Sequence, residues 1–99
     1  MQALRVAVIV VAIAIAARGP GLASDVAYGE YLASECTACH GADPEAPIPA
    51  LRTFSYQELV DGLKAYRDGT RTNTVMKSVA RSLGDAEIEA LAAYFSRRP

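Results

Sequence analysis

The sequence predicts a small all-α domain with three main helices and irregular loops between them. Two segments, which begin near Ser55 and Asp85, repeat apolar residues at the three- and four-residue spacing of an amphipathic helix. No segment has a convincing strand pattern. Three prolines, Pro44, Pro47 and Pro49, argue against any regular element from residue 41 to 54. We therefore expect helices that pack on one another around a proline-rich loop.

The first 23 residues have the pattern of an export signal. Arg5 supplies positive charge, and residues 6–17 form an unbroken apolar run of twelve. A membrane-spanning helix needs about 20 apolar residues, so this run is too short for one. Gly21 and Ala23 place small residues at the two key positions of a cleavage site. We expect cleavage after Ala23, export to the periplasm and one domain at 24–99, with an uncleaved anchor as the alternative.

The chain that follows the signal is small and mildly acidic. Its 76 residues are near the size at which a hydrophobic core alone gives marginal stability, so we expect a further stabilising group. Eight Lys and Arg remain against eleven Asp and Glu, a net charge of −3. This balance argues against nucleic acid as a partner. No membrane span is expected once the signal has been removed.

The first two helices are predicted from a short apolar segment and a capping motif. The first runs from Asp25 to about Glu35. The second begins at Ser55, because "SYQE" is a capping box in which the Ser55 hydroxyl and the Glu58 carboxylate each bond an unpaired amide. Gly69 is a natural stop for this helix. The apolar positions between are Leu59, Leu63 and Tyr66.

The last part of the chain predicts a short helical segment and then a longer helix. After the polar stretch "TRTNT", the short segment runs from about Val75 to Leu83, and Gly84 ends it. The last helix starts at Gly84 or Asp85. One of its faces carries the apolar residues expected to be buried, namely Ile88, Leu91, Ala92 and Phe95.

All cysteine and histidine of the chain lies in "CTACH", residues 36–40. A structural zinc site needs four ligands, usually Cys or His, and the sequence has no fourth. A dithiol redox centre usually occurs in a strand–helix–strand context, and a structural disulfide here would close only a tiny loop. Cys-x-x-Cys-His is instead the pattern of covalent haem attachment. We therefore expect one haem c, attached through Cys36 and Cys39, with His40 as an iron ligand.

The spacing of this motif has a geometric reason. Two thiols three positions apart at a helix end can reach the two vinyl groups of a haem, and the next residue then projects its imidazole over the iron. Such an imidazole needs an orienting partner on its other nitrogen, commonly a backbone carbonyl. The proline-rich loop that follows is placed to provide one.

Met76 is the expected sixth ligand of the iron. It is the only methionine after the signal, just as His40 is the only histidine. A core methionine that fills a gap is the ordinary alternative, but Met76 lies in a polar stretch 36 residues after His40, where it can reach the opposite haem face. Lys64, Lys77 or an open site are the other possibilities. Ligation by His and Met raises the reduction potential and favours electron transfer over substrate chemistry.

These motifs resemble class I c-type cytochromes over nearly the whole mature chain. The resemblance is carried by "CTACHG", Met76 after a polar linker, and the final helix "DAEIEALAAYF". It implies a small cytochrome c fold wrapped around one covalent haem, in which Gly29 or Leu32 packs against Tyr94 where the first and last helices cross. Many members have a Gly-Pro pair whose proline carbonyl accepts the imidazole N–H. Here the stretch is "APIPA", and either Pro47 or Pro49 can serve.

The stretch from "IPALRTF" to "TVMKSVARSLGDAEIEALAAYF" resembles, more narrowly, the haem subunits of flavocytochrome c sulfide dehydrogenases. This resemblance implies an electron-transfer subunit without substrate chemistry of its own, whose redox partner is a flavoprotein subunit that oxidises sulfide. The alternatives are a freestanding electron shuttle to an oxidase or reductase or, if Met76 does not bind iron, a haem enzyme or gas sensor.

Three further residues are candidates for the haem site. Tyr66 either packs on the macrocycle or is an ordinary core tyrosine. Arg71 either pairs with a haem propionate or is a solvated surface residue. Asn73 is a candidate donor to the sulfur of Met76.

Overall fold

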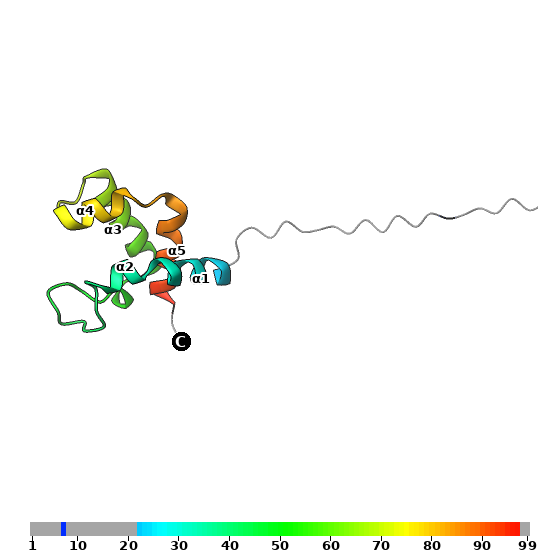
Figure 1. Cartoon of the computed structure of the whole chain (residues 1–99), viewed down its shortest axis with the longest axis horizontal. Coiled ribbons are helices and arrows are strands. Elements are labelled where there is room, and N and C mark those ends of the chain that lie inside the picture. The colour runs from blue at the N-terminus through cyan, green and yellow to red at the C-terminus, as the bar shows by residue number, and fades with distance from the viewer. Residues whose placement is uncertain (1–6, 8–21, 98–99) are drawn as a thin grey trace, which may run out of the picture.

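The computed structural model describes residue 7 and residues 22–97, so most of the predicted signal segment lies outside the described residues. Every regular element in the described part of the chain is helical (Figure 1), which confirms the all-α class. The elements are α1 (Leu22–Leu32), α2 (Ser34–Thr37), the 3₁₀ helix η1 (Leu51–Thr53), α3 (Tyr56–Asp68), α4 (Thr74–Arg81) and α5 (Asp85–Ser96). The helices α1, α3 and α5 are the longest of these, as expected. No described helix has the length and apolar character needed to cross a bilayer.

The crossing of α1 and α5 forms the base of the core. Gly29 on α1 lies so close to α5 that a Cβ atom there would overlap the Ala90 carbonyl oxygen and come within 2.7 Å of Tyr94 Cβ. Glycine is required at such an approach because any side chain would force the helices apart. Of the two residues that the resemblance offered for this crossing, the structure therefore has Gly29, and Leu32 lies half-buried against the core instead.

Helix α5 is the most buried element of the fold. The predicted apolar face is buried, and Ile88 is fully inaccessible to solvent. Ala90 and Ala93 are buried as well, because α1 covers one side of α5 while α3 packs on another. Small alanines on the α1 side let the two backbones approach closely. The last helix is therefore both the structural centre of the domain and the support for α3.

Helix α3 has the two ends that the sequence predicts. The Ser55 hydroxyl accepts the Glu58 N–H at 3.1 Å, and the Glu58 carboxylate accepts the Ser55 N–H at 3.0 Å, which confirms the capping box. These bonds stabilise the ionised carboxylate and lower the pKa of Glu58 from its ordinary value. At the other end Gly69 adopts a φ of 84°, a left-handed conformation that favours glycine.

Three features in the first half of the chain differ from expectation. The first helix was expected to begin at Asp25, but α1 begins at Leu22. The first helix was expected to run unbroken to about Glu35, but α1 ends at Leu32, since the Ala33 N–H bonds the Glu30 carbonyl three residues back in a tightened turn. The loop at 41–54 was expected to hold no regular element, and this is wrong for η1. Beyond Pro49 the amides are free to donate again, and those of Thr53 and Phe54 close 3₁₀ turns.

Helix α4 occupies most of the short helical segment predicted before Gly84. It starts at Thr74, because the side chain of Asn73 caps it, and it ends at Arg81 rather than near Leu83. The amides of Ser82 and Leu83 bond carbonyls three residues back, so the helix tightens and stops. Its main packing partner is α3, which places it at the end of the domain away from α1 (Figure 1).

Candidate functional site

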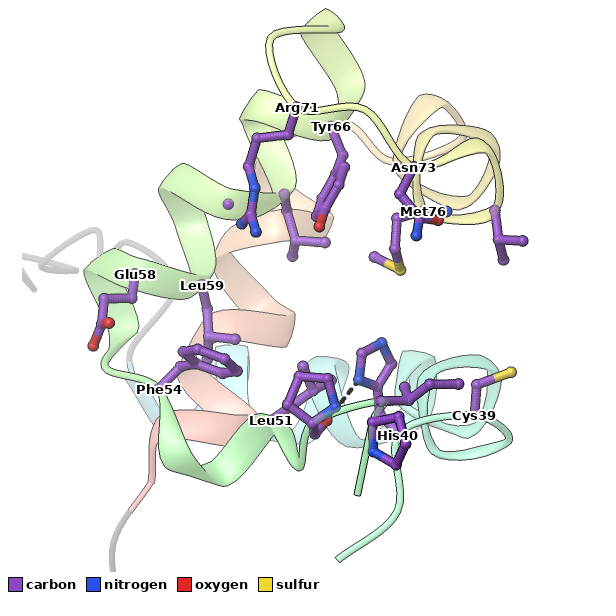
Figure 2. Close-up of a pocket in the computed structure, with 16 residues that line it drawn as sticks. Cys39, His40, Leu51, Phe54, Glu58, Leu59, Tyr66, Arg71, Asn73 and Met76 are labelled. Atoms are coloured by element: carbon purple, nitrogen blue, oxygen red, sulfur yellow. Dashed lines mark hydrogen bonds between the residues drawn. The ribbon is translucent and has the colours of Figure 1, made fainter. Parts of the chain in front are cut away.

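A cavity of about 510 Å³ lies between the loop after α2 on one side and α3 and α4 on the other (Figure 2). This volume is within the usual range for sites that bury a small molecule or cofactor. Most of the wall is apolar and includes Phe54, Leu59 and Leu63. Every predicted site residue except Cys36 lines the cavity, namely Cys39, His40, Pro47, Pro49, Tyr66, Arg71 and Met76. The fold thus brings residues from distant parts of the sequence to one space.

The two cysteines lie on one continuous turn at the end of α2. The amides of Cys39 and His40 both donate to the Cys36 carbonyl, at 3.1 and 2.8 Å, so the helical turn carries on past Thr37. Cys39 is exposed at the cavity, whereas Cys36 packs against the hydrophobic core. Burial, with a smaller contribution from the charge of Glu35, raises the pKa of the Cys36 thiol.

His40 is held by a backbone carbonyl of the proline-rich loop. Its Nδ1 lies 2.7 Å from the carbonyl oxygen of Pro49. A carbonyl can only accept, so Nδ1 donates in this bond, and Nε2 is the ring nitrogen that remains available to a metal. Of the two prolines that the sequence left open, Pro49 makes this bond, while Pro47 lies on the cavity wall.

Met76 faces His40 from the opposite side of the cavity. The imidazole rises from the α2 side and the thioether descends from α4, and the two side chains point toward each other (Figure 2). The position of Met76 follows from the start of α4, where Asn73 Oδ1 accepts the Met76 N–H at 3.0 Å. The Asn73 side chain therefore caps the helix. No bond from its amide nitrogen to the Met76 sulfur occurs among the described residues, and the donor role of Asn73 stays a prediction.

Tyr66 and Arg71 form a stacked pair on the α3 side of the cavity. The guanidinium carbon of Arg71 lies 4.6 Å from the centre of the Tyr66 ring, within the range of a cation–π contact. The Arg71 guanidinium also lies over Gly62, where a Cβ would be 3.4 Å from Arg71 Nη1. Among the described residues, Glu58 supplies the one carboxylate on the wall, and it is already bonded in the capping box. An anionic group bound here would therefore meet the guanidinium of Arg71.

Sequence reasoning missed much of the apolar wall. Leu51, Phe54 and Ile48 line the cavity from the loop and η1, and Gly62 lines it from α3. The helical spacing of Leu59, Leu63 and Tyr66 marked one apolar face of α3, and this spacing was the available signal for that wall. The loop residues had no such periodic signal, because an irregular backbone sets which of their side chains point inward.

The donor set matches the chemistry of a covalently bound haem. An apolar macrocycle requires an apolar wall, and an imidazole nitrogen and a thioether sulfur stand on two sides of this cavity, where they could bind its iron. The cysteine turn stands next to the imidazole, and a guanidinium is available for the acidic groups of a haem. Among residues 22–97, no group of three or more His, Cys, Asp or Glu is placed to hold a metal ion by itself.

Comparison with known proteins identifies relatives of the same kind. The family model for cytochrome c matches residues 26–97. The chain is 42% identical over 80 residues to cytochrome c-554(548) of Halomonas halodenitrificans, covering 75% of this chain and 96% of that protein. It is 42% identical over 69 residues to the thiosulfate dehydrogenase electron acceptor of Thiomonas intermedia, covering 66% of this chain but only 32% of that protein. It is 35% identical over 69 residues to the cytochrome subunit of sulfide dehydrogenase of Chlorobaculum tepidum, covering 68% of this chain and 63% of that protein.

Proposed function

Because the chain belongs to the cytochrome c family, we propose that it is an exported haem subunit that receives electrons from a flavoprotein sulfide dehydrogenase. Family membership makes it an electron-transfer protein with covalent haem c, which supplies the one-electron chemistry of its iron. The sequence holds one Cys-x-x-Cys-His motif and therefore one attachment site. Substrate oxidation, in this proposal, takes place in the flavin-containing partner.

The residues at the cavity have distinct roles in this proposal. Cys36 and Cys39 would form the two thioether bonds to the haem, and His40 and Met76 would supply the ligands of its iron. Pro49 fixes the tautomer and orientation of the imidazole through its carbonyl. Arg71, stacked on Tyr66, neutralises a propionate. A donor on each side leaves no iron position for a substrate, so the arrangement favours electron transfer.

One observation most strongly supports these roles. The His40 imidazole is anchored through Nδ1 to the Pro49 carbonyl, so its Nε2 lone pair is directed into a cavity on whose far side the Met76 thioether stands. If His40 were an ordinary core histidine or Met76 a gap-filling methionine, nothing would require the two side chains to face each other across a cavity. Neither side chain has another described polar partner that would explain its direction.

The sulfide partner and the periplasmic location are supported by the relatives and the amino-terminal pattern. The Chlorobaculum relative is by name a cytochrome subunit of sulfide dehydrogenase, and the Thiomonas relative is by name an electron acceptor of thiosulfate dehydrogenase. Both names mention a dehydrogenase that acts on a reduced sulfur compound. The chain spans about a third of the Thiomonas protein, so its own partner is inferred and not transferred from that relative.

A freestanding carrier is the second candidate. The chain covers 96% of cytochrome c-554(548), so a protein of almost the same extent exists whose name mentions no dehydrogenase. The same cavity serves either role, because both need one haem held between His40 and Met76. The two candidates differ only in whether a flavoprotein remains bound.

The decisive experiment is purification of the native protein, with its optical spectrum, mass and flavin content measured on one sample. We expect a c-type spectrum, a mass raised by one haem, an amino terminus at Ser24 and a copurified flavoprotein. A small cytochrome without flavin would reject the subunit role and leave the carrier. Carbon monoxide binding by the reduced protein at neutral pH would reject ligation by Met76. Free thiols with no haem absorption would reject the proposal altogether.

A further inference from the structure

Helix α4 carries Met76 but is weakly integrated into the domain. Its main packing partner is α3, and Ala80 is its one buried residue. The core at the crossing of α1 and α5 does not include α4. A polar stretch, residues 69–73, connects α4 to α3. A short link, residues 82–84, connects α4 to α5. The position of Met76 therefore depends on what holds these two connections.

Arg67 holds the link behind α4. This residue lies in the last turn of α3, and its Nη1 donates to Asp85 Oδ1 at 2.7 Å and to the Leu83 carbonyl at 3.4 Å. Its Nε donates to Asp68 Oδ1 at 3.4 Å, which orients the guanidinium. One side chain thus joins the end of α3, the link and the first residue of α5. The two ion pairs found among the described residues are both made by Arg67.

The surroundings of Arg67 are unlike those of a free surface arginine. Its side chain is 26% exposed. Its guanidinium donates hydrogen bonds both to the chain just before α5 and to a residue of its own helix. The hydrogen bond from Arg67 lowers the pKa of Asp85 from its ordinary value, as expected for a carboxylate that accepts from a guanidinium. A guanidinium can form this fork because it presents several donors in one plane, whereas an ammonium group acts as a point charge.

We propose that Arg67 is a positioning residue that keeps Met76 at its place on the iron by clamping the link behind α4. The inference rests on the proposed ligand role of Met76. In this proposal the thioether is released when α4 moves away from the cavity, a movement that displaces residues 82–84. A bond from α3 to Leu83 and Asp85 opposes the displacement. Loss of the clamp therefore raises the population in which the sixth position is free.

The affinity of the oxidised holoprotein for added imidazole reports the fraction of molecules in which the sixth position is free. An external ligand that competes with Met76 binds with an apparent affinity scaled by the fraction of molecules whose site is open. We expect Arg67→Gln to tighten imidazole binding about three- to fivefold, the size expected for loss of one forked, partly exposed ion pair. Asp85→Asn should give a smaller change in the same direction, and Arg67→Lys should recover part of the wild-type value.

Arg81→Gln is the matched control, because it removes the same charge from α4 itself. Arg81 is exposed and forms no ion pair with any other residue in the described range. We expect its imidazole affinity to equal that of the wild type. Equal affinities for Arg67→Gln and Arg81→Gln would overturn the inference. So would a lower urea midpoint for Arg67→Gln without tighter imidazole binding, since this is the behaviour of a merely structural bond.

Met76→Ala separates failure of the inference from failure of the proposed function. If Met76 is the ligand, this variant binds imidazole far more tightly than the wild type does and marks the fully open limit. If Met76→Ala binds imidazole no more tightly than the wild type, the ligand role of Met76 is wrong, and the proposed role of Arg67 is wrong as well. If it does bind more tightly while both Arg67→Gln and Asp85→Asn match Arg81→Gln, only the clamp is wrong.

Discussion

His40 and Met76 face each other across one cavity, but the chain holds them by different means. His40 lies next to two cysteines on one turn, and its imidazole is bonded to a carbonyl nine residues ahead. Met76 lies on a short helix that is held by packing on α3, by the Asn73 cap and by the Arg67 clamp. The first side is fixed by bonds close in sequence. The Met76 side is fixed by tertiary contacts, and we therefore expect Met76 to leave its position before His40 does when the fold is weakened.

The two sides also differ in charge. Residues 24–51, which include the His40 side, contain five Asp and Glu and no Lys or Arg. Residues 69–84, which include the Met76 side, contain three Lys and Arg and no Asp or Glu. A near-neutral total thus hides a separation of charge across the cavity. The composition of the whole chain gave no indication of this separation.

Replacement of Met76 should have the largest effect on the difference between the two sides. In Met76→Ala we expect the haem to stay attached through Cys36 and Cys39, while the reduction potential falls by roughly 0.1 V or more. The reduced protein should then bind carbon monoxide. Voltammetry and a carbon monoxide difference spectrum check this, with Val75→Ala as the neighbouring control. An unchanged potential would show that the Met76 side contributes no ligand.

Replacement of Gly29 should weaken both sides together. A Cβ in Gly29→Ala overlaps the Ala90 carbonyl and pushes α1 away from α5, so we expect the free energy of unfolding to fall by about 1–3 kcal/mol. Urea unfolding followed by circular dichroism measures the loss. Gly41→Ala is the control, because a Cβ there meets nothing within 4 Å. Equal stability of the two variants would contradict the close crossing.

Removal of the Asn73 cap should act on the Met76 side alone. Asn73→Ala leaves the Met76 amide without its side-chain acceptor, and loss of such a cap costs about 0.5–2 kcal/mol of helix stability. We expect tighter imidazole binding by the oxidised protein. Ser55→Ala removes the corresponding cap of α3 and should lower the urea midpoint with less change in imidazole affinity. The reverse pattern would argue that α3, not α4, limits release of the thioether.

Replacement of Pro49 should have the smallest effect. The acceptor for His40 is a backbone carbonyl, which Pro49→Ala retains. We expect an unchanged reduction potential and a loss of stability of about 0.4–1 kcal/mol, because the unfolded chain gains freedom. Voltammetry together with urea unfolding checks both values. A large fall in potential would mean that the proline ring itself, and not the carbonyl, orients the imidazole.

Local patterns in the sequence predicted much of the fold and of the site. The capping box at Ser55, the stop at Gly69 and the apolar face of α5 depend on neighbouring residues, and the structure has all three. The cysteine motif and the single mature methionine pointed to two sides of one cavity, and the structure places both there. Such features are readable because each depends on a short window of the chain.

Features that depend on contacts across the fold were not readable in this way. The choice of Gly29 over Leu32 depends on where α5 lies, and the choice of Pro49 over Pro47 depends on the path of an irregular loop. The clamp at Arg67 joins residues 16 and 18 positions apart, and no local pattern marks it. The break after Leu32 and the helix η1 depend on single backbone bonds that several sequences could form.

Helix α3 has a consequence for how the length of this chain can vary. It is capped at both ends, and its 13 residues span about 20 Å from the proline-loop side of the cavity to the α4 side. Loss of a single residue from its middle would shorten it by about 1.5 Å and rotate everything beyond by about 100°. Tyr66 would then turn off the cavity while Leu59 stayed in place. The length of α3 sets the separation and orientation of the two ends of the cavity, so the number of its residues is as strongly constrained as their identity.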